Sequence, residues 1–236
     1  CSNEGSVITA TGCVLDGEVR YVYVGGYAGY GYSFDGCHNA ADIIYESNGG
    51  RVGGIAGYAN GALTNCTNTG TINAPASDEV GGIAGRTGYG GDATLSSLEN
   101  SGAVTGANNV GGVIGYIYGN VSGGYVDIYR TLTLSSFENS GAVSGANYVG
   151  GIAGQLYLDA TSRYTAEFKL TANSFNNSGD ISGESYVGGL FGYARTDDSE
   201  SRMSDSSSSC SVSGQYYVGG LAGKTETIGL VDCSNE

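Results

Sequence analysis

Several residue types that often mark function are scarce in this chain of 236 residues, which has no Trp, one Pro and one His. Cations are also few, because 9 Lys and Arg stand against 23 Asp and Glu, a formal net charge of −14. An acidic chain without a basic run repels phosphate backbones and anionic membrane surfaces, so we expect no nucleic-acid partner. No apolar run approaches the roughly 18 to 20 residues of a membrane-spanning helix, so we expect no transmembrane segment.

Residues that carry common catalytic chemistry are few and scattered. A Ser-His-Asp or Cys-His site would have to use His38, which directly follows Cys37. Neighbours in an extended strand point to opposite faces, so we interpret His38 as a surface residue. The chain contains no Gly-x-Ser-x-Gly, and its six cysteines form no CxxC pair and no zinc-ligand spacing. The sequence therefore predicts no catalytic residue, no metal site and no cofactor.

Glycine, in contrast, is abundant, with 44 residues, and it is periodic. A Val-Gly-Gly step, followed by two apolar or small residues and another Gly, occurs seven times. Its valines are Val24, Val52, Val80, Val110, Val149, Val187 and Val218, separated by 28, 28, 30, 39, 38 and 31 residues. A steady minimum with a varying excess indicates a fixed unit that carries insertions. We assign a structural repeat role to the paired glycines: Gly25, Gly26, Gly53, Gly54, Gly81, Gly82, Gly111, Gly112, Gly150, Gly151, Gly188, Gly189, Gly219 and Gly220.

A second element places an asparagine four residues before a β-branched residue. The asparagines are Asn3, Asn39, Asn68, Asn100, Asn139 and Asn177, while the last unit, "SSSSCSVSG", has serine instead. On stacked coils they would form a ladder in which each amide bonds to the next coil. Cys1, Cys37 and Cys66 also share one repeat position. Their spacing of about 4.8 Å would permit a disulfide, so a disulfide and a ladder of buried thiols both remain open.

Each unit holds two or three short strand patterns joined by Gly, Asn and Ser, with no stretch of helical period. Parallel strands without helical crossovers are satisfied when each unit forms one turn of a solenoid. The sequence therefore predicts an all-β fold, a right-handed parallel β-helix (β-solenoid) of about seven irregular coils with variable insertions. We expect a single repetitive domain over residues 1–236. A less regular solenoid or a sandwich is the alternative.

The repeated unit, [NC]-x-[SN]-G-x-[VI]-x-G-x-x-x-V-G-G-[ILV]-[AF]-G, resembles the GLUG motif over nearly the whole chain. The resemblance implies a glycine-rich, extracellular β-helical region of a bacterial cell-surface or adhesin-like protein, of a kind also found near IgA-cleaving peptidases. It implies no catalytic residues of its own. Because "CSNE" stands at residues 1–4 and again at 233–236, we expect a segment of a longer array with flanking repeats or domains of the same polypeptide. A lipidated Cys1 is the rival reading.

Tyrosines are the main candidates for function, because many lie in or just after the Val-Gly-Gly step, where the insertions occur. Variable loops on a rigid scaffold are the usual place for recognition, and Tyr offers a large contact surface with little entropy to lose. We expect ligand-binding residues among Tyr116, Tyr118, Tyr125, Tyr129, Tyr157 and Tyr164. The alternative is that these rings cover the scaffold or each other.

The expected function is that of a non-enzymatic extracellular segment of a bacterial surface protein, an adhesin-like stalk or binding module that recognises a host-surface glycan or protein. A pure spacer that presents another domain is one alternative. A carbohydrate-active β-helical enzyme is the other. For a lyase, however, Lys169, Lys224 and the seven arginines fall at no repeated position, and we interpret the acidic residues 197–200 as a solvated loop.

Overall fold

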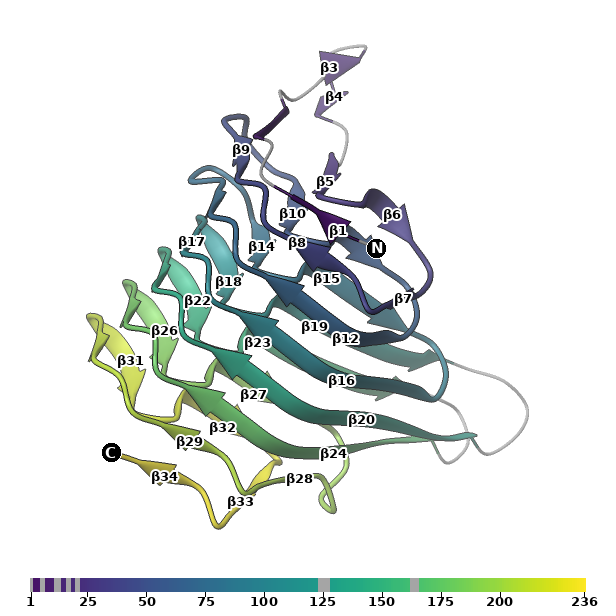
Figure 1. The fold of residues 1–236 in the computed structure, drawn as a ribbon. Helices are drawn as coiled ribbons and strands as arrows, with labels where there is room; N and C mark the ends of the chain where they lie inside the picture. The colour runs from purple at the N-terminus through teal and green to yellow at the C-terminus, as the bar shows by residue number, and fades with distance from the viewer. Residues whose placement is uncertain are drawn as a thin grey trace.

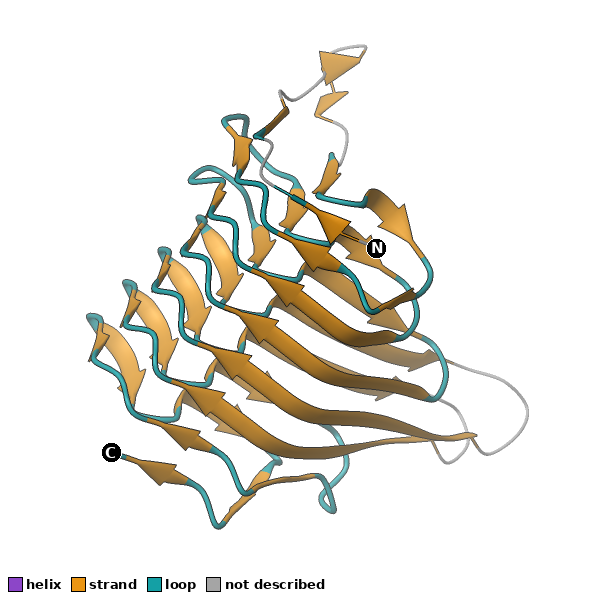
Figure 2. Cartoon of the chain, viewed as in Figure 1, coloured by secondary structure: helices purple, strands orange, loops and turns teal. Residues whose placement is uncertain are grey.

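The computed structural model describes residues 2–4, 7–10, 14–15, 18–19, 22–122, 128–161 and 166–236, and all regular structure within these ranges is β-strand. The same ranges contain no helix long and apolar enough to cross a membrane. Parallel strands stack into four sheets along the molecule (Figure 2). One coil visits each sheet once.

The third coil illustrates this path. It runs from β12 (Leu63–Asn68) through β13 (Ile72–Asn73), β14 (Glu79–Gly81) and β15 (Ala84–Tyr89) to β16 (Ala93–Asn100). The last of these lies beside β12, with Asn68 opposite Asn100. The chain thus returns to its starting sheet one strand further along the axis.

We name the sheets by their character. The long sheet contains β1 (Ser2–Asn3), β7 (Phe34–Asp35), β8 (His38–Asn39), β12, β16, β20 (Ile128–Asn139), β24 (Ala166–Asn177), β28 (Arg202–Ser204), β29 (Ser207–Ser208), β33 (Gly229–Val231) and β34 (Ser234–Asn235). The short sheet contains β2 (Ile8–Ala10), β9 (Ile43–Tyr45), β13, β17 (Val104–Thr105), β21 (Val143–Ser144), β25 (Ile181–Ser182) and β30 (Val212–Ser213).

The other two sheets flank the Val-Gly-Gly step. The VGG sheet contains β5 (Tyr23–Gly25), β10 (Arg51–Gly53), β14, β18 (Asn108–Gly111), β22 (Asn147–Gly150), β26 (Ser185–Gly188) and β31 (Tyr216–Gly219). The tyrosine sheet contains β6 (Ala28–Gly31), β11 (Ala56–Ala59), β15, β19 (Ile114–Ser122), β23 (Ala153–Thr161), β27 (Phe191–Arg195) and β32 (Ala222–Glu226). A separate antiparallel pair consists of β3 (Val14–Leu15) and β4 (Glu18–Val19).

The coil is right-handed, as Figure 1 shows. With the N-terminus above, the long-sheet strands in front run from right to left, and the strands of the tyrosine sheet behind them run from left to right. Every strand pair in the four stacked sheets whose register is given is parallel. The predicted right-handed parallel β-helix is therefore confirmed.

The Val-Gly-Gly step aligns in register through all seven coils of the VGG sheet. A Cβ on Gly150 would lie 2.3 Å from the carbonyl oxygen of Ala153, and one on Gly151 would lie 2.3 Å from Cγ of Asn177. Neither glycine has a positive φ; the left-handed backbone falls on the preceding Tyr148, at +54°. These glycines are thus required by close packing and not by a left-handed turn.

The asparagines form a continuous buried ladder. Asn100 shows the pattern, because its Nδ2 donates to Asn139 Oδ1 at 2.8 Å and to the carbonyl of Gly102 at 2.8 Å. Its Oδ1 accepts from Nδ2 of Asn68, also at 2.8 Å. Every hydrogen-bonding atom of this amide therefore has a partner. These hydrogen bonds offset the free-energy cost of removing the amide from water.

The ladder changes chemistry at the seventh coil, where the sequence substitutes serine for asparagine. Nδ2 of Asn177 donates to the sulfur of Cys210 at 3.1 Å, and that sulfur lies 3.3 Å from the hydroxyl of Ser208. Asn235 returns to the asparagine position one coil later, opposite Ser208. The serine and the cysteine together thus fill the place of one amide.

Two apolar cores run along the axis. The larger lies between the long and tyrosine sheets and includes the stacked pair Phe137 and Phe175, whose centroids are 5.1 Å apart. The smaller lies between the short and VGG sheets. Cys37 and Cys66 are buried as free thiols on adjacent coils, and burial raises the pKa of Cys66 to about 11. Cys1 lies outside the described residues.

The longest coils extend their strands sideways, and we call this extension the wing, residues 119–122, 128–131, 158–161 and 166–170. Strand β19 pairs with β23 as far as Ser122, and β20 pairs with β24 from Ile128 onward. The preceding β15 ends at Tyr89, and β16 begins at Ala93. We expected variable loops here, but two adjacent coils of similar length continue their ladders because each satisfies the other's backbone.

Candidate functional site

One face of the solenoid gathers tyrosines and cations. Side chains at alternate positions of the tyrosine sheet point outward and align across coils. One outward row consists of Tyr30, Tyr58, Arg86, Tyr116, Gln155, Tyr193 and Lys224. A second row consists of Gly88, Tyr118, Tyr157, Arg195 and Glu226.

Residues that precede the Val-Gly-Gly valines complete this surface. We define the tyrosine face by the residues that touch in one connected network: Tyr23, Tyr30, Arg51, Tyr58, Glu79, Arg86, Tyr116, Tyr118, Tyr148, Tyr157, Tyr186, Tyr193, Arg195, Tyr217, Lys224 and Glu226. The network runs from the first Val-Gly-Gly coil to the seventh.

Cations on the tyrosine face lie over aromatic rings. The guanidinium of Arg86 is 4.6 Å from the ring centre of Tyr116 and 4.8 Å from that of Tyr118. Arg195 lies 4.8 Å from the ring of Tyr157 and donates to its hydroxyl. Such contacts contribute about 0.5 to 2 kcal/mol each, depending on desolvation. They fix the orientation of the rings.

Carboxylates pair with these cations. Glu79 bridges Arg51 at 2.5 Å and Arg86 at 2.8 Å. Glu226 pairs with Lys224 at 2.7 Å and reaches Arg195 at 3.8 Å. The tyrosine face as defined therefore holds four cations and two carboxylates, and each cation contacts one of these carboxylates, although the chain as a whole carries −14.

This arrangement corrects the expectation that the cations occupy no repeated position. Arg86 and Lys224 lie in the same outward row, four coils and more than a hundred residues apart in sequence. Each residue of this row directly follows the last glycine of the step, but the residue varies among Tyr, Arg, Gln and Lys, so no shared residue type marks the position. The strand register confirms that these positions align.

Of the predicted ligand-binding tyrosines, three come together. The ring centres of Tyr116 and Tyr118 are 5.8 Å apart, and those of Tyr118 and Tyr157 are 6.4 Å apart. Burial raises the pKa of Tyr116 to about 12, against the opposing charge of Arg86. Tyr129 lies elsewhere, exposed on β20 of the long sheet. Tyr125 and Tyr164 lie outside the described residues.

Sequence reasoning missed a second group of tyrosines, those immediately before the valine of the step. Tyr148, Tyr186 and Tyr217 have φ of +54°, +55° and +53°. Their rings stack at 4.8 and 4.6 Å, tilted by 14° and 8°. The repeated "YVGG" in the last three units was the signal that could have identified them. A bulky residue with positive φ is unusual, so the stack is held in a strained backbone by its surroundings.

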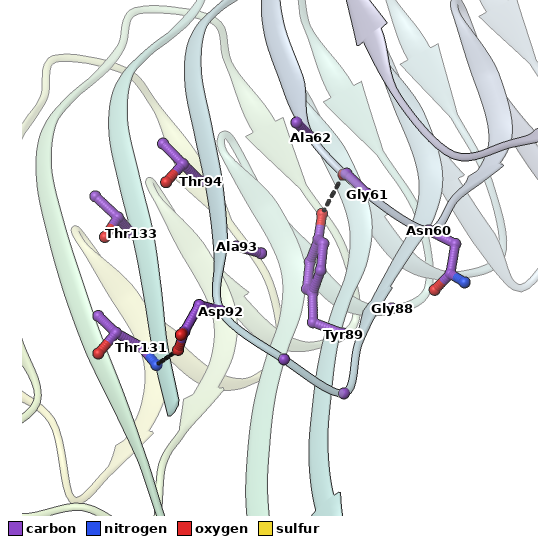
Figure 3. Close-up of a pocket in the computed structure, with 12 residues that line it drawn as sticks. Asn60, Gly61, Ala62, Gly88, Tyr89, Asp92, Ala93, Thr94, Thr131 and Thr133 are labelled. Atoms are coloured by element: carbon purple, nitrogen blue, oxygen red, sulfur yellow. Dashed lines mark hydrogen bonds between the residues drawn. The ribbon is translucent and has the colours of Figure 1, made fainter. Parts of the chain in front are cut away.

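A pocket opens beside the tyrosine face, where the chain passes from the tyrosine sheet to the long sheet (Figure 3). It encloses about 570 Å³ and is lined by residues 60–62 and 88–94 together with Thr131 and Thr133. Oδ1 of Asp92 accepts from the backbone N–H of Thr131 at 2.8 Å, and the hydroxyl of Tyr89 donates to the carbonyl of Gly61 at 3.3 Å. Asn60 connects the pocket to Tyr30, whose hydroxyl lies 3.4 Å from Asn60 Nδ2.

The side chains considered for catalysis have structural partners. Nδ1 of His38 lies 2.6 Å from the hydroxyl of Thr67. In the acidic loop, Asp197 accepts from the N–H of Ala160 at 3.1 Å, and Glu200 pairs with Lys169 at 2.9 Å. Within the described ranges, no three His, Cys, Asp or Glu side chains are grouped so that they could hold a metal ion.

A second hollow, of about 390 Å³, lies on the outer face of the long sheet. It is lined in part by Glu99 and Glu138, which face each other across β16 and β20.

Comparison with known proteins supports the repeat. The family model of the GLUG motif matches residues 48–73. This stretch contains one complete Val-Gly-Gly step and the ladder residue Asn68, and equivalent positions recur in register on the other coils. Comparisons with curated proteins and with solved structures gave no match. The chain therefore contains the GLUG motif, built into a parallel β-helix.

Proposed function

We propose that this chain is a non-catalytic, extracellular β-helical segment of a bacterial surface protein that binds a glycan or protein ligand through its tyrosine face, as an adhesin does. The observation that carries this proposal is the single network of tyrosines and cations across the seven Val-Gly-Gly coils, with Tyr116, Tyr118 and Tyr157 near its centre. The GLUG motif at residues 48–73 supports the placement in a surface protein.

The chemistry of this face suits recognition. Tyrosine presents an apolar ring and a hydrogen-bonding hydroxyl with few rotatable bonds, so ordering it on binding costs little entropy. On this face the cations already hold several rings in place, which reduces that cost further. Each cation of the face is already paired with Glu79 or Glu226 and lies over an aromatic ring, so the face offers a ligand mainly ring surface and hydroxyl groups, which suit an uncharged ligand.

The experiment measures binding of the purified chain to a glycan array and to mucin-coated surfaces. We expect the triple variant Tyr116→Ala, Tyr118→Ala, Tyr157→Ala to bind at least about tenfold more weakly than the unaltered chain, a difference of about 1.4 kcal/mol. Tyr129→Ala is the matched control, because its exposed ring lies on the long sheet. Unaltered binding by the triple variant would overturn the proposal.

The same experiment distinguishes the alternatives. A chain that binds to neither surface would act as a spacer. The stacking of Tyr148, Tyr186 and Tyr217 on one another supports this alternative, because these rings then cover each other. Release of shortened saccharides from a bound polysaccharide would indicate an enzyme. In that case Glu99→Gln and Glu138→Gln should abolish the release.

A further inference from the structure

The pocket beside the tyrosine face owes its shape to unequal coil lengths. Strand β20 begins at Ile128, but its pairing with β16 starts only at the pair Ala93 and Leu132. The wing therefore projects past the shorter coil before it and leaves a step, and the turn through Gly90 and Gly91 forms one side of that step. The pocket thus lies where a short coil meets a longer one.

The lining is rich in neutral hydrogen-bonding groups. It holds the amide of Asn60 and the hydroxyls of Thr94, Thr131 and Thr133. Thr94 and Thr133 are register partners on neighbouring strands, and Figure 3 shows them side by side with Thr131 next to them. A hydroxyl donates one hydrogen bond and accepts two, so this cluster matches a ligand that itself carries several hydroxyls.

The charge of the lining selects against acids. Asp92 is its charged residue, and the lining includes no Lys, Arg or His. Oδ1 of Asp92 accepts from the N–H of Thr131, and Oδ2 is the second acceptor of this carboxylate. An anionic ligand would meet this carboxylate and the net charge of −14, whereas a neutral hydroxyl can donate to it.

Two glycines in the lining are not required by packing. A Cβ on Gly91 would meet no atom within 4 Å, and one on Gly90 would come no closer than 3.9 Å to the carbonyl oxygen of Asn120. Neither has a positive φ. Glycines at such positions leave the backbone open to close approach by a ligand.

Building on the proposed function, we propose that this pocket binds one neutral saccharide unit of the ligand that the tyrosine face contacts. Its volume of about 570 Å³ lies within the range of small-molecule sites, about 300 to 1,000 Å³. Asn60 joins the two surfaces, because it lies within hydrogen-bonding distance of the hydroxyls of both Tyr30 and Tyr58. A glycan chain would therefore continue from the pocket onto aromatic rings.

The test uses the purified chain with fluorescent lactose and N-acetyllactosamine as neutral probes and sialyllactose as the acidic counterpart. Gly91→Leu adds a branched side chain to the lining at a position where a Cβ meets no atom within 4 Å, so it should obstruct the pocket and weaken binding of the neutral probe at least about tenfold. Gly91→Ala is the matched control and should bind like the unaltered chain. Thr94→Val with Thr133→Val removes two hydroxyls while keeping their shape, and should also weaken binding.

The outcomes separate the two proposals. Loss of neutral-probe binding in Gly91→Leu, with retention in Gly91→Ala, supports the pocket. Unaltered binding in Gly91→Leu, together with loss in the triple tyrosine variant, overturns the pocket and leaves the proposed function standing. Tighter binding of sialyllactose than of the neutral probes overturns the assignment to a neutral sugar. If none of the three probes binds while a protein ligand does, the pocket proposal fails and the proposed function stands.

Discussion

The inner asparagine ladder and the outer tyrosine face are both built from register rows, yet they differ in how strictly each residue is repeated. Five successive ladder coils place asparagine beside the second glycine of the step, at Asn39, Asn68, Asn100, Asn139 and Asn177. On the outer row, neighbouring coils place Tyr58, Arg86 and Tyr116 at equivalent positions. The two rows face different environments.

The difference follows from what each residue contacts. An inner asparagine bonds to the carbonyl two residues later in its own coil and to the asparagine of the next coil, whereas an outer side chain can rotate into solvent. The buried partners cannot adjust, so one residue type satisfies them on five successive coils. Rings and guanidinium groups can exchange contacts with one another, so the outer row can vary while its network stays connected.

The largest effect is expected from a change at the inner glycines. Gly150→Val places a Cβ 2.3 Å from the carbonyl of Ala153 and 2.7 Å from that of Leu190, and neither backbone atom can move without disturbing a strand. We expect a loss of more than about 4 kcal/mol in the free energy of unfolding, measured by urea denaturation. Gly91→Ala, in open space, should change it by less than about 0.5 kcal/mol. A folded, fully stable Gly150→Val chain would contradict the packing role.

A change in the ladder should have the next largest effect. Asn100→Asp keeps the shape but removes both donated hydrogen bonds, to Gly102 and Asn139, and buries a charge. We expect a loss of about 3 kcal/mol in the free energy of unfolding near neutral pH, and a smaller loss near pH 4, where a protonated carboxyl donates again.

The control for this variant is Asn176→Asp, because Asn176 is exposed on the same strand as the ladder residue Asn177. It should cost less than about 0.5 kcal/mol. Equal stability of the two variants would show that the ladder contributes nothing specific.

The smallest effect concerns the tyrosine face. Since the pKa of Tyr116 is raised to about 12 by burial, its folded-state pKa exceeds the unfolded value of about 10. This group therefore contributes full stability below about pH 10, and that contribution is lost as the pH rises towards 12.

Urea denaturation at about pH 9 and about pH 11 measures this effect. The stability of the unaltered chain should fall more than that of Tyr116→Phe, which cannot ionise. Tyr216→Phe, with a side chain 59% exposed, should fall as the unaltered chain does. An identical fall in all three chains would place Tyr116 in solvent.

Much of the architecture could be predicted because it rests on contacts that repeat. The spacing of the valines and the recurring asparagines indicated stacked coils, and the structure confirms the parallel β-helix. The sequence also showed the length of each coil. It did not show which structure the inserted residues adopt. Whether an insertion is a loop or a strand depends on its neighbour, and β20 is extended because β24 lies alongside it.

The candidate site was predicted only in part. Tyr116, Tyr118 and Tyr157 follow the step, so their common face could be anticipated, and the structure brings them together. Tyr129 follows an insertion, and the return of the chain carries it to the long sheet. The ring that each cation contacts could not be predicted, since a long side chain can reach several positions of the neighbouring coil. The stack beginning at Tyr148 was missed, although the repeated "YVGG" carried its signal.

By itself the sequence determined the period of the coil, the closely packed glycines and the position of the asparagines, because each coil repeats the same local contacts with its neighbour. The tertiary structure alone decided which tyrosines meet which cations, how the wing is paired and where the pocket opens. Those features depend on the lengths of adjacent coils relative to each other. A difference in length produces a paired extension or a step only when the two coils are stacked side by side.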